Sequence, residues 1–125
     1  MNTEGSLKSC KDLLVLQKSM ALVKDIYHLT GCFPPDERFG VVSQLRRASV
    51  SVPSNIAEGQ SRHTSDQFVQ FLTHAEESLA ELETQILIAV DLDYSSKNEA
   101  NQALAQIDEL KRMLNSLRRK LATRH

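Results

Sequence analysis

The segment RRASVSVPSNIAEGQSR, from Arg46 to Arg62, has helical spacing but contains a proline, a glycine and almost no bulky side chain. When successive residues are advanced by about 100°, one narrow sector gathers positions that are three or four residues apart. This sector, which begins just before the segment, consists of Val42, Leu45, Ser49, Val52, Ile56 and Gly59. The spacing predicts a helix that turns one face toward a core.

A second strip of this helix is small and apolar, where a monomeric bundle would ordinarily carry charges. It consists of Val50, Pro53 and Ala57. Small residues let helices approach closely, so the strip predicts contact with a second partner. Pro53 also removes the hydrogen bond that the carbonyl of Ser49 would accept, which predicts a kink in the second helix. A bend around the helix's own core is the alternative explanation of Pro53.

The side of the helix opposite the core is polar. Serine and asparagine are weak helix formers, and their use here favours a specific contact over a solvated surface, which is the alternative. The predicted oligomer or partner interface combines this polar stripe with the apolar strip and consists of Arg47, Val50, Ser51, Pro53, Asn55, Ala57, Glu58 and Arg62.

Three further helices follow from the periodicity of apolar residues. The first has on one face Leu13, Leu16, Met20, Val23 and Tyr27, widened by Leu22, Ile26 and Leu29. The third has two seven-residue repeats, Phe68, Ala75, Leu82, Ala89 and Leu72, Leu79, Ile86. The fourth runs through Ala100, Ala103, Ile107, Leu110, Leu114, Leu117 and Leu121. The last two patterns are typical of coiled-coil-like seams.

Start and stop signals bound these helices. Gly31 and the pair Pro34 and Pro35 end the first one, while Thr64 and Ser96 open capping boxes for the third and fourth. We therefore expect helices at about 10–29, 37–61, 65–93 and 97–122. Four amphipathic helices with short connections predict a single all-α domain over residues 1–125, an up-down-up-down four-helix bundle.

The composition is that of a soluble globular protein, because 41% of the 125 residues are apolar, 25% are charged and 5% are aromatic. No apolar run approaches the about 18 residues of a membrane span, and the first residues lack the pattern of a secretory signal. We expect a cytoplasmic protein without membrane contact. Cys10 and Cys32 form no CxxC pair, which predicts free thiols.

The formal charge of -1 hides a strong segregation along the chain. The segment 66–96 has seven acidic residues and no Lys or Arg, whereas 111–125 has six basic residues and no acid. Such asymmetry indicates either contact between oppositely charged helices or a polyanion site at the basic end. Both interpretations stay open at this point.

Motifs for catalysis and cofactor binding are largely missing. A di-iron site in a bundle needs Glu-x-x-His on two helices, and only Asp25 to His28 has a similar spacing. No P-loop or dinucleotide-binding motif occurs. We therefore expect no catalytic residue, metal, cofactor or small-molecule substrate. Arg119 and His125, six apart, are similar to the Arg-x(4-6)-His pair of HEPN ribonucleases, which makes such a ribonuclease a minor alternative.

Three stretches together resemble a family of bacterial four-helix-bundle proteins. They are FPPDERFG at 33–40, QLRRASVSVPSNIAEGQSR at 44–62 and FVQFLTHAEESLAELET at 68–84. These stretches look like the proteins named for the 23S rRNA intervening sequences in which some members are encoded. The resemblance extends from Leu13 to Leu121, and its most specific part is the block from Arg46 to Arg62.

The resemblance implies a ring-like homopentamer of four-helix bundles. It also implies kinship with the accessory protein of diversity-generating retroelements, a basic pentameric bundle that partners a reverse transcriptase and binds nucleic acid. This chain departs from these relatives in its near-neutral charge and in having no tryptophan. No catalytic residue is established for the family, so none is carried over.

We expect a non-catalytic homo-oligomer that binds RNA or a ribonucleoprotein partner through basic residues gathered by ring symmetry. The predicted nucleic-acid-binding residues are Arg46, Arg112, Arg118, Arg119, Lys120 and Arg124, with Arg47 and Arg62 on the second helix beside Arg46. The favourable interaction of cations with a helix C-terminus explains part of the basic tail as an alternative. The alternative function is a protein-interaction scaffold without nucleic-acid binding.

Overall fold

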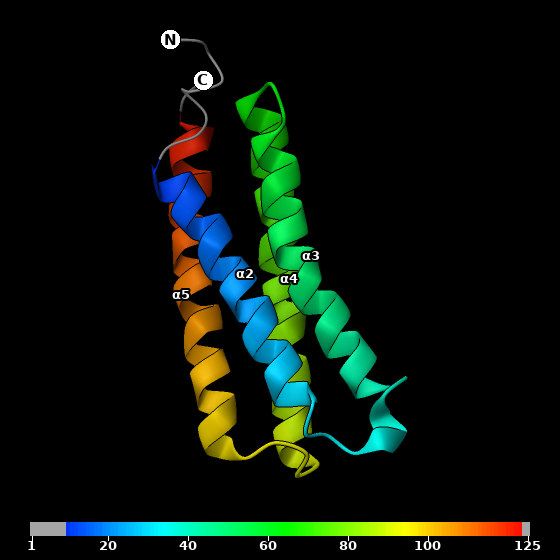
Figure 1. The fold of residues 1–125 in the computed structure, drawn as a ribbon. Coiled ribbons are helices and arrows are strands. Elements are labelled where there is room, and N and C mark those ends of the chain that lie inside the picture. Colours follow the sequence, from blue (N-terminus) through cyan, green and yellow to red (C-terminus); the bar gives the residue numbers. More distant parts are fainter. Residues whose placement is uncertain (1–9, 124–125) are drawn as a thin grey trace.

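Four long helices make up the computed structural model, which describes residues 10–123 (Figure 1). They are α2 (Cys10–Thr30), α3 (Val41–Gln60), α4 (Ser65–Asp91) and α5 (Lys97–Ala122), with a 3₁₀ turn, η1 (Pro35–Glu37), between α2 and α3. Successive helices run in opposite directions, and α2 also packs against α5, which closes the bundle. No strand occurs within residues 10–123. The predicted all-α, up-down-up-down four-helix bundle is confirmed.

α3 begins at Val41 rather than at residue 37, where the sequence predicted its start. Pro34 has an extended backbone and Pro35 opens η1, so the two prolines hold this segment in a turn of its own. Gly40, with φ −106° and ψ −115°, separates that turn from the helix. The carboxylate of Glu37 accepts a hydrogen bond from the N–H of Val41 at 3.4 Å, which satisfies one free donor of the first helical turn.

α4 ends at Asp91, two residues before the predicted end, because Asp93 adopts the left-handed conformation with φ 63°. The N–H of Tyr94 donates to the carbonyl of Ala89 at 2.9 Å, and that of Asp93 donates to Val90 at 3.0 Å. This pair of bonds is a Schellman motif, which ends a helix and satisfies its last carbonyls.

The predicted caps at the starts of α4 and α5 are confirmed. The hydroxyl of Thr64 accepts a hydrogen bond from the N–H of Gln67, and that of Ser96 accepts one from the N–H of Glu99, each at 3.2 Å. The hydroxyl of Ser96 also donates to the carboxylate of Glu99. Each cap stabilises a helix start by about 1 kcal/mol.

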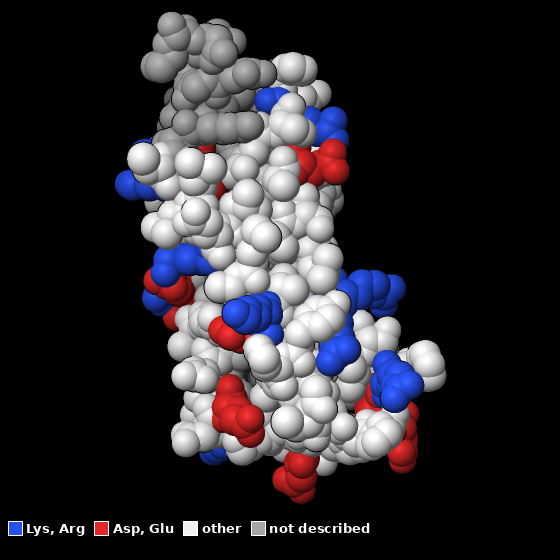
Figure 2. All heavy atoms as spheres, in the orientation of Figure 1, with Lys and Arg blue, Asp and Glu red and all other residues white. Residues whose placement is uncertain are grey.

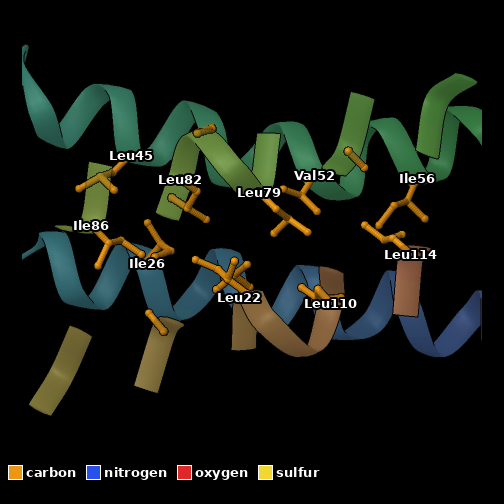
Figure 3. Packing of buried hydrophobic residues seen from close by; sticks show 14 of the residues in the cluster. Leu22, Ile26, Leu45, Val52, Ile56, Leu79, Leu82, Ile86, Leu110 and Leu114 are labelled. Carbon is orange, nitrogen blue, oxygen red and sulfur yellow. The ribbon is translucent and has the colours of Figure 1, made fainter. Parts of the chain in front are cut away.

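The core lies where the seams of α4 and α5 meet the predicted core sector of α3 (Figure 3). All seven predicted seam residues of α4 are fully buried, and those of α5 are buried except for the half-buried Leu117. The six predicted core residues of α3 are buried as well. Side chains from different helices point toward one another, as Leu45, Ile86 and Ile26 do near one end of the view.

The predicted core face of the first helix is wrong in its main strip. Leu13, Met20 and Tyr27 are exposed, and Leu16 and Val23 are only partly buried. The buried face consists of Asp12, Val15, Ser19, Leu22, Ile26 and Leu29, which includes the three residues predicted to widen it. Two polar residues interrupt the apolar pattern of this buried face. The outer strip is apolar throughout, so it gave the stronger periodic signal.

α3 and α4 pack closely against each other near their connection. A Cβ atom at Gly59 would lie 2.8 Å from Cδ1 of Phe68 and 2.9 Å from Cβ of Phe71. Further along the two helices, the hydroxyls of Ser51 and Ser78 form a hydrogen bond at 2.8 Å. Small residues in the segment 46–62 therefore serve the packing of α3 against α4.

α3 continues through Pro53 without interruption. The hydroxyl of Ser54 donates to the carbonyl of Val50, and the side-chain amide of Asn55 donates to the carbonyl of Ser51, each at 2.8 Å. These bonds flank the carbonyl of Ser49, which lacks the donor that an ordinary residue at position 53 would supply. Side-chain bonds of this kind to the carbonyl four residues earlier favour a bend, so they act in the same sense as the proline.

The end of the bundle opposite the α3–α4 connection is held by Tyr94. Its hydroxyl donates to the carboxylate of Glu37 at 2.8 Å, and its ring lies 5.9 Å from the ring of Phe33, measured between centroids. The hydrogen bond to Glu37 raises the pKa of Tyr94, and the negative charges of Glu37 and Asp36 add to this effect. The contact joins the connection before α3 to the connection before α5.

Gly59→Ala is expected to lower the free energy of unfolding, by about 1–3 kcal/mol, because the added methyl overpacks a site bounded by Phe68 and Phe71. Alanine would otherwise stabilise a helix interior by about 1 kcal/mol relative to glycine, so the sign of the effect is informative. Urea unfolding followed by circular dichroism measures it. Ala105→Gly at an exposed position of α5 is the control and should cost only the propensity difference. A more stable Gly59→Ala variant would contradict the close contact.

Tyr94→Phe is expected to weaken the dependence of stability on alkaline pH. Because Glu37 raises the folded-state pKa of Tyr94, the stabilisation by this bond is present below about pH 10, the ordinary tyrosine value, and is lost as the pH rises through the folded pKa. Thermal unfolding should be measured from below about pH 10 upward. The unfolding temperature should fall more steeply with pH for the wild-type chain than for Tyr94→Phe. Tyr27→Phe, as the control, should keep the steeper fall, and equal slopes for wild type and Tyr94→Phe would count against the bond.

Candidate interaction surfaces

Two members of the predicted polar stripe are turned toward α4 of the same chain. The amide of Asn55 donates to the hydroxyl of Ser51 at 3.0 Å, Ser51 lies 2.8 Å from the hydroxyl of Ser78, and Ser78 donates to the carbonyl of His74 at 3.1 Å. Since each hydroxyl has one proton, the chain of bonds runs from α3 to α4 in that direction. These side chains therefore link two helices of one bundle.

The other charged members of the stripe behave differently. Arg62 forms an ion pair with Glu58 at 2.9 Å, and its guanidinium lies 4.6 Å from the ring centroid of Phe71 on α4. This ion pair of Arg62 and Glu58 is solvent-accessible and contributes less than about 1 kcal/mol to stability. Arg47 is exposed. Of the predicted stripe, Arg47 and Glu58 are thus the most accessible to a partner.

The predicted apolar strip of α3 lies beside the outer strip of α2 and forms a shallow apolar groove with it. We call this the α2–α3 groove; it is lined by Leu16, Met20, Val23, Val50, Pro53, Ser54 and Ala57. Met20 is 58% exposed and Val50 is 40% exposed. Figure 2 shows this face of the molecule, with a largely uncharged area over α2 and α3 and both basic and acidic side chains around it. An exposed apolar surface of this kind is typical of an interaction site.

The contribution of α2 to this groove was missed at the sequence level because its outer strip was assigned to the core. A signal was available: the first helix carries apolar residues around much of its circumference, and one bundle buries only one side. The excess of apolar positions indicated a second apolar side outside the core.

Two of the predicted nucleic-acid-binding arginines have partners within the chain. Arg46 donates to the hydroxyl of Thr30 at 2.9 Å, and its guanidinium lies 4.4 Å from the ring centroid of Tyr27. Arg118 forms an ion pair with Glu76 on α4 at 2.7 Å, and this hydrogen bond raises the pKa of Arg118. Both side chains are only partly accessible to a ligand.

The charge segregation of the sequence is partly satisfied by contacts between α4 and α5. Besides the pair of Arg118 and Glu76, Lys111 forms an ion pair with Glu83 at 2.5 Å. For these charges, the interpretation that oppositely charged helices contact each other is therefore correct. Three basic residues on the outer side of α5 are arranged differently.

Arg112, Arg119 and Lys120 lie together around a shallow hollow near the end of α5, which Asn115 and Ser116 complete. We call this the α5 hollow. All three basic side chains are exposed. Arg112 also forms an ion pair with Asp108 on the same helix, an exposed contact that a competing anion could displace at little cost. Arg124 lies outside the described residues.

The described residues offer little for metal or redox chemistry. Within 10–123, no group of three or more His, Cys, Asp or Glu residues could hold a metal ion. Cys10 and Cys32 are free and exposed. No described helix is both long and apolar enough to cross a membrane. Of the HEPN-like pair, Arg119 lies in the α5 hollow, and His125 is outside the described residues.

Comparison with known proteins gives one family and one fold. A family model described as 23S rRNA-intervening sequence protein matches residues 11–116. The chain is similar to the crystal structure of a protein of unknown function from the S23 ribosomal protein family of Bacteroides thetaiotaomicron. The two chains are 21% identical with a TM-score of 0.81, and the similarity covers 87% of this chain and 98% of that one. At this identity the likeness supports the fold alone. A search of curated proteins finds no match.

Proposed function

We propose that this chain, which belongs to the 23S rRNA-intervening sequence protein family, is a non-catalytic homo-oligomer that binds RNA, alone or in a ribonucleoprotein, through the α5 hollow. The observation that carries the proposal is the grouping of Arg112, Arg119 and Lys120 on one exposed helix face. Arginine suits phosphate recognition because its planar guanidinium can donate two hydrogen bonds at once.

The chemistry of the hollow favours contacts to phosphates over contacts to bases. Its side chains are cationic or polar, and no aromatic residue lines it. Sequence-specific RNA binding commonly stacks unpaired bases on aromatic side chains. Binding here should therefore depend strongly on salt and weakly on sequence, as expected when phosphate contacts release counterions.

Self-association would make a small basic site effective. A single chain carries a formal charge of -1, and its α5 hollow has three basic residues. Identical hollows on several copies could engage one polyanion together, which raises the overall affinity without any new type of contact. The exposed α2–α3 groove supports self-association, since it leaves apolar area that an isolated bundle does not cover.

A protein-interaction scaffold is the second candidate function. The observation in its favour is that Arg46 and Arg118 are engaged within the chain and Arg112 is paired with Asp108. These pairings reduce the cationic surface, whereas the α2–α3 groove stays open. Under this alternative the groove is the functional site and the α5 hollow is a solvated surface.

Replacing Arg119 and Lys120 by glutamine is expected to weaken binding to a structured RNA and to flatten its salt dependence. Each lost phosphate contact lowers the slope of log K against log salt by about 0.7–0.9. The measurement is a binding titration across a salt series, with the native mass followed by light scattering. The control, Arg38→Gln with Lys97→Gln, removes the same charge at the opposite end of the bundle and should bind like the wild type.

Three outcomes of this experiment are informative. Equal losses in the two double variants would indicate a net-charge effect and contradict a site at the α5 hollow. Absence of binding by an intact wild-type oligomer would favour the scaffold. RNA cleavage during the titration that is abolished by deleting residues 123–125 would support the HEPN-like ribonuclease, whereas intact RNA is expected here.

A further inference from the structure

We propose that the α2–α3 groove of one copy binds the outer face of α4 of a second copy. This inference rests on the homo-oligomeric part of the proposed function and names the two surfaces that would meet. It is independent of whether the oligomer binds RNA.

The outer face of α4 carries an exposed apolar strip. Leu87 and Ile88 are 49% and 45% exposed, although the helix buries seven other apolar residues in the core. Ala80 and Thr84 precede them at helical spacing and are also exposed, so the strip has small residues at one end and large ones at the other. We call these four positions the α4 outer strip. All four are exposed in the described bundle, and burying the exposed parts of Leu87 and Ile88 would stabilise a contact.

The charges around the two surfaces are complementary. The segment 66–96 contains no Lys or Arg, and the exposed acids beside the α4 outer strip are Glu77, Glu81 and Asp91. The exposed charged residues beside the α2–α3 groove are Lys24, four residues after Met20, Arg47, three residues before Val50, and Glu58, next to Ala57. Glu58 forms an ion pair with Arg62, so the border of the groove keeps a net positive charge. Contact between the groove and the strip therefore brings opposite charges together. A symmetrical contact of groove with groove would bring bases against bases, which disfavours that arrangement.

The dimensions of the two surfaces also agree. From Leu16 to Val23 the groove runs along two turns of α2, about 11 Å, and from Ala80 to Ile88 the strip covers about 12 Å of α4 at 1.5 Å per residue. Pro53 and Ala57 keep the α3 wall of the groove low. A low wall allows a third helix to approach to the about 8–10 Å that packed helices adopt.

Because the two surfaces differ, each copy offers one of each. Such a heterologous contact builds a closed ring, or an open filament where the rotation does not close, and it does not build a two-fold dimer. The arrangement therefore makes a distinctive prediction: chains with only one intact surface should pair with chains that have only the other.

The test uses two double variants at exposed or partly exposed positions. The groove variant, Met20→Glu with Ala57→Glu, places acids where the acidic face of α4 would dock. The strip variant, Leu87→Lys with Ile88→Lys, places bases where the basic border of the groove would dock. Each variant alone is expected to be monomeric in size-exclusion chromatography with light scattering. An equimolar mixture at high concentration should give a complex of two chains, twice the 14.0 kDa of one.

Control measurements separate folding from assembly. Circular dichroism should show helicity and thermal unfolding of both variants close to those of a monomeric bundle. Leu14→Lys, an exposed apolar position of α2 outside the groove, should keep the wild-type mass. Because the masses are measured without RNA, loss of RNA binding in the α5 hollow variant and loss of assembly in these variants are separate results.

Several outcomes would overturn the proposal. A strip variant that keeps the wild-type mass would show that α4 is not the occupant of the groove. Two monomeric variants whose mixture stays monomeric would exclude the heterologous pairing. A wild-type chain that is monomeric at all concentrations would remove the homo-oligomer itself, and with it this inference, while leaving RNA binding by the α5 hollow open to its own test.

Discussion

Gly59 lies directly against the side chains of Phe68 and Phe71 on α4, so no side chain of α3 separates them from the α3 backbone at this point. The same two helices are joined further along by the hydrogen bond between Ser51 and Ser78. Because α4 also supplies a fully buried seam to the core, the position of α3 on α4 sets the space into which α2 and α5 pack. The unusual composition of the segment 46–62 follows from this constraint, since larger residues would separate the two helices.

The circumference of α3 is divided among several environments, each with its own residue types. Bulky aliphatic side chains face the core, small and polar ones face α4, and Val50, Pro53 and Ala57 border α2 and the solvent. This last group is low in profile and apolar, so it turns the boundary between two helices into a groove. Small residues in α3 therefore have two effects: they let α3 pack closely on α4, and they leave a low apolar surface that is suited to another helix.

Much of the architecture could be predicted from local patterns, but local patterns did not show which side of α2 faces the core. The seams of α4 and α5 are uninterrupted, and their caps are explicit in Thr64 and Ser96, so these helices were predicted closely. In α2 the buried face includes Asp12 and Ser19, two polar residues that an apolar pattern does not assign to a core. The hydroxyl of Ser19 donates to the carbonyl of Leu16 on the same helix, and the amide of Gln60, distant in sequence, donates to the backbone carbonyl of Asp12. The candidate surfaces were only partly foreseen for the same reason, because charge counting does not show which arginines meet an acid across the bundle.

The first and last described turns of the bundle lie at the same end, because four antiparallel helices return the chain to its starting side, and α2 packs beside α5 (Figure 1). The order in which the helices are connected is therefore separable from the way they pack. A circularly permuted chain, with a short linker from α5 to α2 and new termini in the 31–40 connection, retains every helix contact of the bundle. Such a chain would move the termini away from the α5 hollow, and so allow fusions that leave the basic end unobstructed.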